Sequence, residues 1–179
     1  MLTRRIVSVS CSVCIAVLVF SALMPLMHGG ARAESYEELY ECLIDLKDWE
    51  MGDPEGMKLE QPGFKMIHAM REYSRESKEV SAMIMMGTQV ASSLPSSEGM
   101  MNMETSEGKF EFKEVDSFKV YIVFDKKKNS GVITVLLTPK VTVDAVFSLS
   151  YENMTSEEAL ELSKKFDWKK IRKRVDALR

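Results

Sequence analysis

A run of strand-like segments with no helical pattern between them is the feature that most constrains the fold of this chain. A Gly- and Pro-rich stretch, Trp49–Gly63, precedes them and is expected to be a turn-rich connection. The strand-like segments are rich in β-branched and aromatic residues and are Phe64–Tyr73, Lys78–Thr88, Met101–Thr105, Lys109–Val115, Phe118–Phe124, Gly131–Leu137 and Val141–Leu149. Consecutive strands joined by short turns pair as antiparallel neighbours, whereas parallel strands need a long crossover. The sequence therefore predicts an α+β fold built on an antiparallel β-sheet of about five to seven strands.

Two amphipathic segments flank the strands and predict an N-terminal and a C-terminal helix that pack on the sheet. Between Ser35 and Lys47, apolar residues recur every three or four positions, and acidic residues lie in the first turn. The second helix begins at the capping box Thr155-Ser-Glu-Glu158 and has a candidate interruption at Phe166-Asp167-Trp168. Its basic second half suits either a charged outer face or a membrane surface, and we favour the charged outer face of a packed helix.

The first 33 residues have the pattern of a targeting segment. Arg4 and Arg5 precede a long apolar run, and Ala31 and Ala33 form an A-x-A cleavage signature. We therefore expect residues 1–33 to be a signal peptide cleaved after Ala33, residues 34–179 to form a single α+β domain, and the protein to be periplasmic or secreted. The alternative is an uncleaved N-terminal anchor that makes the protein membrane-associated, because about 20 apolar residues can span a bilayer.

Charge and cysteine content argue against some classes of function. The chain has 24 Lys and Arg and 27 Asp and Glu, and three of the basic residues but none of the acidic ones precede residue 34. The remaining 146 residues carry 21 basic and 27 acidic side chains, a net charge of −6, which argues against nucleic acid as a partner. Cys11 and Cys14 have the C-x-x-C spacing of redox and zinc sites but lie inside the apolar run. We expect the remaining Cys42 to be an inert core residue.

Several short motifs make the chain resemble a family of uncharacterised, exported bacterial single-domain proteins. They are Gly56-Met57, Gly63-Phe64, Ala69-Met-Arg-Glu-Tyr73, Asp116-Ser-Phe-Lys119 and the stretch from Ser156-Glu157-Glu158 to Phe166-Asp167-Trp168. The strand-rich middle and the closing helix also resemble the photosystem PsbP/Mog1-like fold, an antiparallel sheet covered by helices. The resemblance implies export and this fold, and no activity comes with it.

The sequence contains no recognisable motif of enzyme chemistry. His68 is the only histidine after residue 33, which excludes a multi-histidine zinc site in that part of the chain. A G-x-S-x-G elbow, a phosphate-binding loop and a glycine-rich dinucleotide fingerprint are all missing from the sequence. A dyad of Cys42 and His68 is conceivable, but nothing around either residue indicates a reactive thiol. We therefore predict a non-enzymatic protein.

Methionine is strongly over-represented in this chain. Of the 14 methionines, 11 follow residue 33, and they include the groups Met66-x-His68-x-Met70 and Met83-x-Met85-Met86. Alternate residues of a strand share a face, so the first group projects to one side of the sheet. A two-residue turn at Arg75-Glu76 would place His68 opposite Met83 and Met66 opposite Met85. The sequence thus predicts a cluster of thioethers around one imidazole, made of Met66, His68, Met70, Met83 and Met85.

Two interpretations of this cluster stay open. Methionine packs irregular cores and adaptable apolar grooves, and a turn one residue longer would pair His68 with Ile84 and dissolve the cluster. Thioethers and an imidazole also suit the soft ions Cu(I) and Ag(I). Our first expectation is a binding module that holds a protein or an apolar ligand on a Met-rich face. The second is a periplasmic soft-metal protein with those five residues as ligands, and no cofactor other than such an ion is expected.

Overall fold

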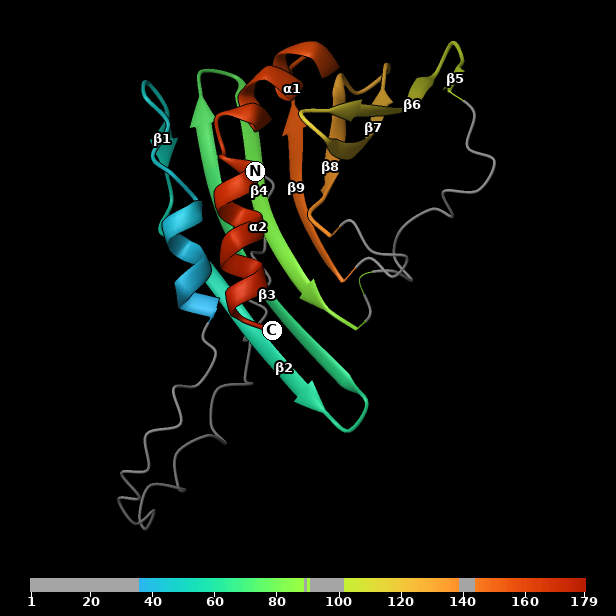
Figure 1. The fold of residues 1–179 in the computed structure, drawn as a ribbon. Coiled ribbons are helices and arrows are strands. Elements are labelled where there is room, and N and C mark those ends of the chain that lie inside the picture. The colour runs from blue at the N-terminus through green and yellow to red at the C-terminus, as the bar shows by residue number, and fades with distance from the viewer. Residues whose placement is uncertain (1–35, 89, 91–101, 139–143) are drawn as a thin grey trace, which may run out of the picture. The chain divides into compact units, whose positions relative to one another are not determined.

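The structure is a computed structural model that describes residues 36–88, 90, 102–138 and 144–179 (Figure 1). The chain divides into two compact units, and every described residue lies in the second of them, residues 33–179. The predicted signal peptide with its two cysteines lies outside the described residues. The described elements are η1 (a 3₁₀ helix, Tyr36–Cys42), β1 (Glu50–Met51), β2 (Glu55–Gln61), β3 (Phe64–Arg75), β4 (Lys78–Gly87), β5 (Met103–Glu104), β6 (Gly108–Val115), β7 (Phe118–Asp125), β8 (Ser130–Leu136), β9 (Ala145–Glu152), α1 (Ser156–Lys164) and α2 (Trp168–Ala177).

The nine strands of the described residues form one sheet in which every pairing is antiparallel. The strand order is β1-β3-β4-β9-β8-β7-β6-β5, and β2 pairs with the same edge of β3 as β1 does. The predicted α+β class and antiparallel sheet are confirmed. The expected count of five to seven strands is too low.

The two strands that the sequence analysis missed, β1 and β2, lie in the stretch expected to be a connection. Gly63 does lie in a turn, between β2 and β3, with φ at +78°. Gly56 lies inside β2, where a Cβ atom would come within 2.5 Å of Cδ2 of Tyr36. Gly56 therefore allows η1 to pack closely on the strand and is not part of a turn. Because glycine is more common in loops, its presence made this strand resemble a loop in the sequence.

The other predicted strands are close to the observed ones. Five of them agree with β3, β4, β6, β7 and β8 to within two residues at each end. The strand predicted over Met101–Thr105 is shorter, because β5 contains Met103 and Glu104 alone. The first residues of the predicted strand Val141–Leu149 lie outside the described part of the chain, where β9 begins at Ala145.

The helices differ from the expected pair in length and number. The N-terminal helix is a short 3₁₀ helix that ends at Cys42 and does not continue to Lys47. The C-terminal segment forms two helices, because the side chain of Asp167 accepts hydrogen bonds from the backbone nitrogens of Lys169 and Lys170 and so starts a new helix. The capping box at Thr155 is confirmed. Trp168, Ile171 and Val175 of α2 are buried, which confirms that this helix is packed.

The sheet has a helix-covered face and an open face, on which no described helix packs (Figure 1). The main core lies under the helices, where Phe166 contacts Phe147 and Trp168 contacts Phe118, with ring centroids 5.2 and 5.6 Å apart. A second, smaller cluster of buried residues lies on the open face and consists of Val90, Tyr121, Leu136 and Val146. The side chains that alternate with the core residues form the open face. On the central strands it consists of Met66, His68, Met70, Glu72 and Ser74 of β3, Glu79, Ser81, Met83 and Met85 of β4, and Val146, Ser148, Ser150 and Glu152 of β9.

Candidate functional site

The register of the β3–β4 hairpin decides how the predicted methionine cluster is arranged. The turn consists of Glu76 and Ser77, with Arg75 opposite Lys78, so His68 faces Met85 and Met70 faces Met83. The predicted pairs His68–Met83 and Met66–Met85 are therefore wrong by two residues. Arg75 is the last residue of β3, and its guanidinium lies over the ring of Trp49, 4.9 Å from the centroid.

A shift of two residues in the pairing register leaves every side chain on its predicted face of the sheet. A shift of one residue would have moved every side chain to the opposite face. All five predicted residues consequently project from the open face, and all five are half-buried. Met86, which alternates with them, is buried in the core under the helices. The structure therefore places Met66, His68, Met70, Met83 and Met85 together on one half-buried surface, at whose border Met85 packs against the buried Val146.

Strand β2 adds two residues to this surface that the sequence analysis did not include. Met57 lies opposite His68 and Leu59 lies opposite Met66, and these two side chains are 43% and 36% exposed. The alternation of apolar and polar residues in Met57-Lys58-Leu59 is a pattern typical of a strand. It was not recognised because the surrounding stretch is rich in glycine and proline. We call the complete set the methionine patch; it consists of Met57, Leu59, Met66, His68, Met70, Met83 and Met85.

Exposed apolar side chains are concentrated on the open face. Among the described residues, six large hydrophobic side chains are exposed, and five of them lie on this face: Met57, Leu59, Met103, Val123 and Val132. The sixth, Met51, lies opposite the buried Tyr73 on the helix-covered side, where its Sδ accepts a hydrogen bond from the backbone nitrogen of Leu46. Concentration of exposed apolar surface on one face is typical of an interaction site, whereas scattered single residues are not.

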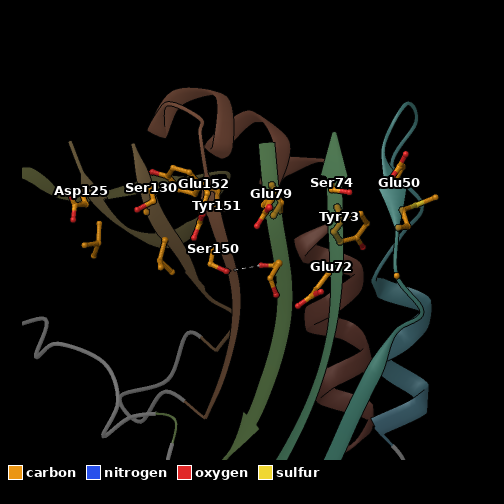
Figure 2. Close-up of a pocket in the computed structure, with 17 residues that line it drawn as sticks. Glu50, Glu72, Tyr73, Ser74, Glu79, Asp125, Ser130, Ser150, Tyr151 and Glu152 are labelled. Carbon is orange, nitrogen blue, oxygen red and sulfur yellow. Dashed lines mark hydrogen bonds between the residues drawn. The ribbon is translucent and has the colours of Figure 1, made fainter. Parts of the chain in front are cut away.

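A cavity of about 750 Å³ lies on the open face near the β3–β4 turn (Figure 2). One row of cross-strand partners runs along it from β1 to β7, and Figure 2 shows the row from Glu50 at one end to Asp125 at the other. We call it the acidic row; its members are Glu50, Ser74, Glu79, Glu152, Ser130 and Asp125. Glu72 lies in the neighbouring row, which also carries Ser81, Ser150, Val132 and Val123.

The carboxylates of this cavity lack cationic partners within the described part of the chain. The side chains of Glu50, Glu72, Glu79 and Glu152 form no ion pair or hydrogen bond there, although 13 other ion pairs of described residues are present. Among the described residues, Asp125 accepts hydrogen bonds only from the backbone nitrogens of Lys127 and Lys128 in the following turn. Glu79 and Glu152 are direct cross-strand partners, an arrangement of like charges that destabilises a sheet.

These carboxylates do not converge on one point. Among residues 36–88, 90, 102–138 and 144–179, no three His, Cys, Asp or Glu side chains lie close enough together to hold a metal ion. The acidic row is therefore an extended negative surface, not a cation cage. The sequence analysis missed it because its members come from six strands and meet only in the folded sheet.

Three further titratable side chains, those of Cys42, Tyr73 and Tyr151, lie in the buried core under the helices. Cys42 is buried under the helices, where burial raises the pKa of its thiol, and the sheet separates it from His68 on the open face. The expected core position of Cys42 is thus confirmed, and the dyad with His68 is excluded. Burial also raises the pKa of Tyr73 and of Tyr151 to about 12, and the Tyr73 hydroxyl donates to the carbonyl of Ile44.

Comparison of the chain with models of protein families, with curated proteins and with solved structures found no match. The resemblance to exported single-domain proteins with a PsbP/Mog1-like fold therefore stays a prediction. No helix of the described residues has the length and apolarity needed to cross a membrane.

Proposed function

We propose that this protein is an exported, non-enzymatic binding module that holds an apolar ligand against the methionine patch. The observation that carries the proposal is the methionine patch itself, in which the exposed Met57 and Leu59 lie beside half-buried methionines of β3 and β4. Thioether side chains are flexible and polarizable, so the patch can adapt its shape to an aliphatic chain. Export is supported by the signal-peptide pattern of residues 1–33, and mass analysis of the protein recovered from the periplasm tests it, because cleavage after Ala33 predicts Glu34 as the first residue.

Binding can be tested by following the methionine methyl groups by NMR while dodecanol is added to the purified protein. We expect the resonances of Met57, Met66, Met70, Met83 and Met85 to shift and to saturate. The buried Met86 and Met154 serve as internal controls, because both lie in the core on the other side of the sheet. Equal shifts of the two sets, or none, would contradict the proposal.

Substitution of exposed patch residues separates binding from folding. Met57→Ser and Leu59→Ser change side chains that are partly exposed, so we expect the variants to fold. Each should weaken dodecanol binding by about tenfold, because roughly 1.5 kcal/mol of apolar contact is lost. Met103→Ser is the matched control, since Met103 is 60% exposed and lies on β5, outside the patch. Similar losses in all three variants would contradict a site at the patch.

Binding of Cu(I) or Ag(I) is the second candidate function, and the hairpin register favours it. His68 has Met57 opposite it on β2 and Met85 opposite it on β4. Directly opposed residues have Cβ atoms about 5 Å apart, so one imidazole lies between two thioethers. Met66 and Met70 flank it along the strand, and this set of nitrogen and sulfur donors is one that soft ions select.

A titration of the purified protein with Ag(I) tests this second function. We expect saturable binding at one site, weakened by His68→Ala and by Met85→Leu, which keeps the apolar volume and removes the sulfur. Met103→Leu is the control, because it removes a sulfur outside the patch. Binding that is indifferent to His68→Ala would refute the metal site and leave the apolar one standing.

The third expectation, membrane association through an uncleaved N-terminal segment, concerns residues outside the described part of the chain. It stays a prediction. The same mass analysis distinguishes it from cleavage, because an uncleaved protein retains residues 1–33.

A further inference from the structure

The open face changes from acidic to apolar along the central hairpin. From the turn onward, β3 presents Ser74, Glu72, Met70, His68 and Met66, and β4 presents Glu79, Ser81, Met83 and Met85. Neighbours on one face of a strand are about 7 Å apart, so Glu72 lies one such step from Met70. A ligand that lies along this hairpin therefore contacts carboxylates at one end and thioethers at the other.

The acidic end is a recess of the size that small ligands occupy. Its volume of about 750 Å³ lies within the ordinary range for ligand pockets, roughly 300–1,000 Å³. Val123 and Val132, 48% and 37% exposed, line it together with the carboxylates. The hydroxyl of Ser150 donates to the carbonyl of Ser81, 3.4 Å away, and both serines are also part of the lining. The recess thus combines negative charge, hydroxyl groups and short apolar side chains.

The charge of the recess selects the occupant of the neighbouring patch. Glu79 and Glu152 face each other, and together with Glu50 and Glu72 they have no cationic partner among the described side chains. A bound cation would relieve this repulsion, whereas an anionic head group would add to it. An aliphatic chain on the methionine patch is therefore favoured when its head group is positively charged.

We infer that the ligand of the open face is an amphipathic amine, a small molecule whose aliphatic chain lies on the methionine patch and whose ammonium group lies at the facing pair Glu79 and Glu152. The inference rests on the proposed function and extends it by naming the class of ligand. It commits to a free amphiphile and not to a peptide, because the acidic and apolar regions adjoin along the two strands of one hairpin, a span that one aliphatic amine covers. The recess, whose lining includes no member of the methionine patch, holds the head group alone.

The experiment compares dodecylamine, dodecanol and dodecanoate, which share one chain and differ in head group, by titration calorimetry below their aggregation concentrations. We expect dodecylamine to bind about tenfold more tightly than dodecanol, as two or three exposed charge contacts would give. Dodecanoate should bind most weakly. The preference for the amine should decrease as the salt concentration rises, because the carboxylates are exposed.

Two variants locate the head group. Glu79→Gln with Glu152→Gln should reduce the preference for the amine over the alcohol to about twofold and leave dodecanol binding unchanged. This double variant removes a repulsion and is expected to fold. Glu161→Gln is the control; this glutamate lies on α1, where it pairs with Lys164. The control should keep the full preference.

Each outcome decides between the two proposals. Equal affinity for the amine and the alcohol, unchanged in the double variant, would overturn the inference and leave the apolar site intact. Failure of all three probes to bind would refute the apolar site itself. Binding of the short diamine putrescine as tightly as dodecylamine, or of a basic amphipathic peptide in place of dodecylamine, would also overturn the inference, because the patch would then not hold the chain of a small amphiphile.

Discussion

Substitution of the two facing glutamates of the acidic row is expected to stabilise the protein, whereas most substitutions destabilise one. Glu79 of β4 and Glu152 of β9 are direct cross-strand partners, both are exposed, and neither has an ion pair within the described part of the chain. We expect Glu79→Gln and Glu152→Gln each to raise the free energy of unfolding, because either one removes the same repulsion.

The size of the effect follows from the geometry of the pair. Facing residues have Cβ atoms about 5 Å apart, and two carboxylates that turn away from each other into water lie about 7 Å apart. Two unit charges at that separation in water repel by about 0.6 kcal/mol. The double variant should be barely more stable than either single variant, because the repulsion belongs to the pair and can be removed once.

Urea unfolding of the wild type, both single variants and the double variant forms a complete double-mutant cycle. We expect a coupling energy of about 0.6 kcal/mol that disappears at about 1 M salt, where the screening length is about 3 Å. Glu161→Gln is the reference, because it removes a carboxylate that pairs with Lys164 and should not stabilise the protein. Strictly additive effects, or destabilisation by both single substitutions, would refute the reasoning that these carboxylates interact unfavourably.

Three further predictions concern the scaffold. Thr155→Ala removes the capping box of α1 and should lower the free energy of unfolding by about 1 kcal/mol in urea titrations. Gly131→Ala places a Cβ atom 2.5 Å from the Tyr151 hydroxyl and against the backbone of β7, and should destabilise the protein by about 1–3 kcal/mol in the same assay. Burial raises the pKa of Tyr73 and of Tyr151 from 10.0 to about 12, so both stay neutral in the folded protein while the unfolded chain ionises. The contribution of these two tyrosines to stability should therefore be constant below pH 10 and fall between pH 10 and 12. Difference absorbance should show these two tyrosines titrating last, and ionisation of all five tyrosines near pH 10 without unfolding would contradict the prediction.

Local patterns in the sequence predicted the parts of the fold that depend on neighbours along the chain. The capping box at Thr155 and the alternation of Met66, His68 and Met70 each involve a few consecutive residues. Both are confirmed, because such patterns depend on backbone geometry within one element. The grouping of the methionine cluster on one face also survived an error of two residues in the turn, because two is the period of a strand.

The features that could not be predicted depend on contacts between distant segments. Gly56 resembles a loop residue until Tyr36 is known to pack against it. Glu79 and Glu152 are more than 70 residues apart in sequence and meet because β4 pairs with β9, a neighbour that the order of strands along the chain does not specify. No local pattern contains this pairing, so the acidic row could be recognised only from the topology.

The same hairpin register determines both the core and the candidate site. Ala69 faces Ile84 under the helices, and on the opposite side of the same strands His68 faces Met85. A slip of one residue would move His68 and its neighbours into the core and bring Ala69 and Ile84 to the surface, so core packing selects against it. Exposed open-face residues such as Met57, Glu79 and Glu152 can nevertheless be exchanged without changing this core, because they alternate with the residues that build it. The order of head-group and chain contacts along β3 and β4 is thus maintained by the burial of the opposite face, which allows these exposed side chains to vary independently of the fold.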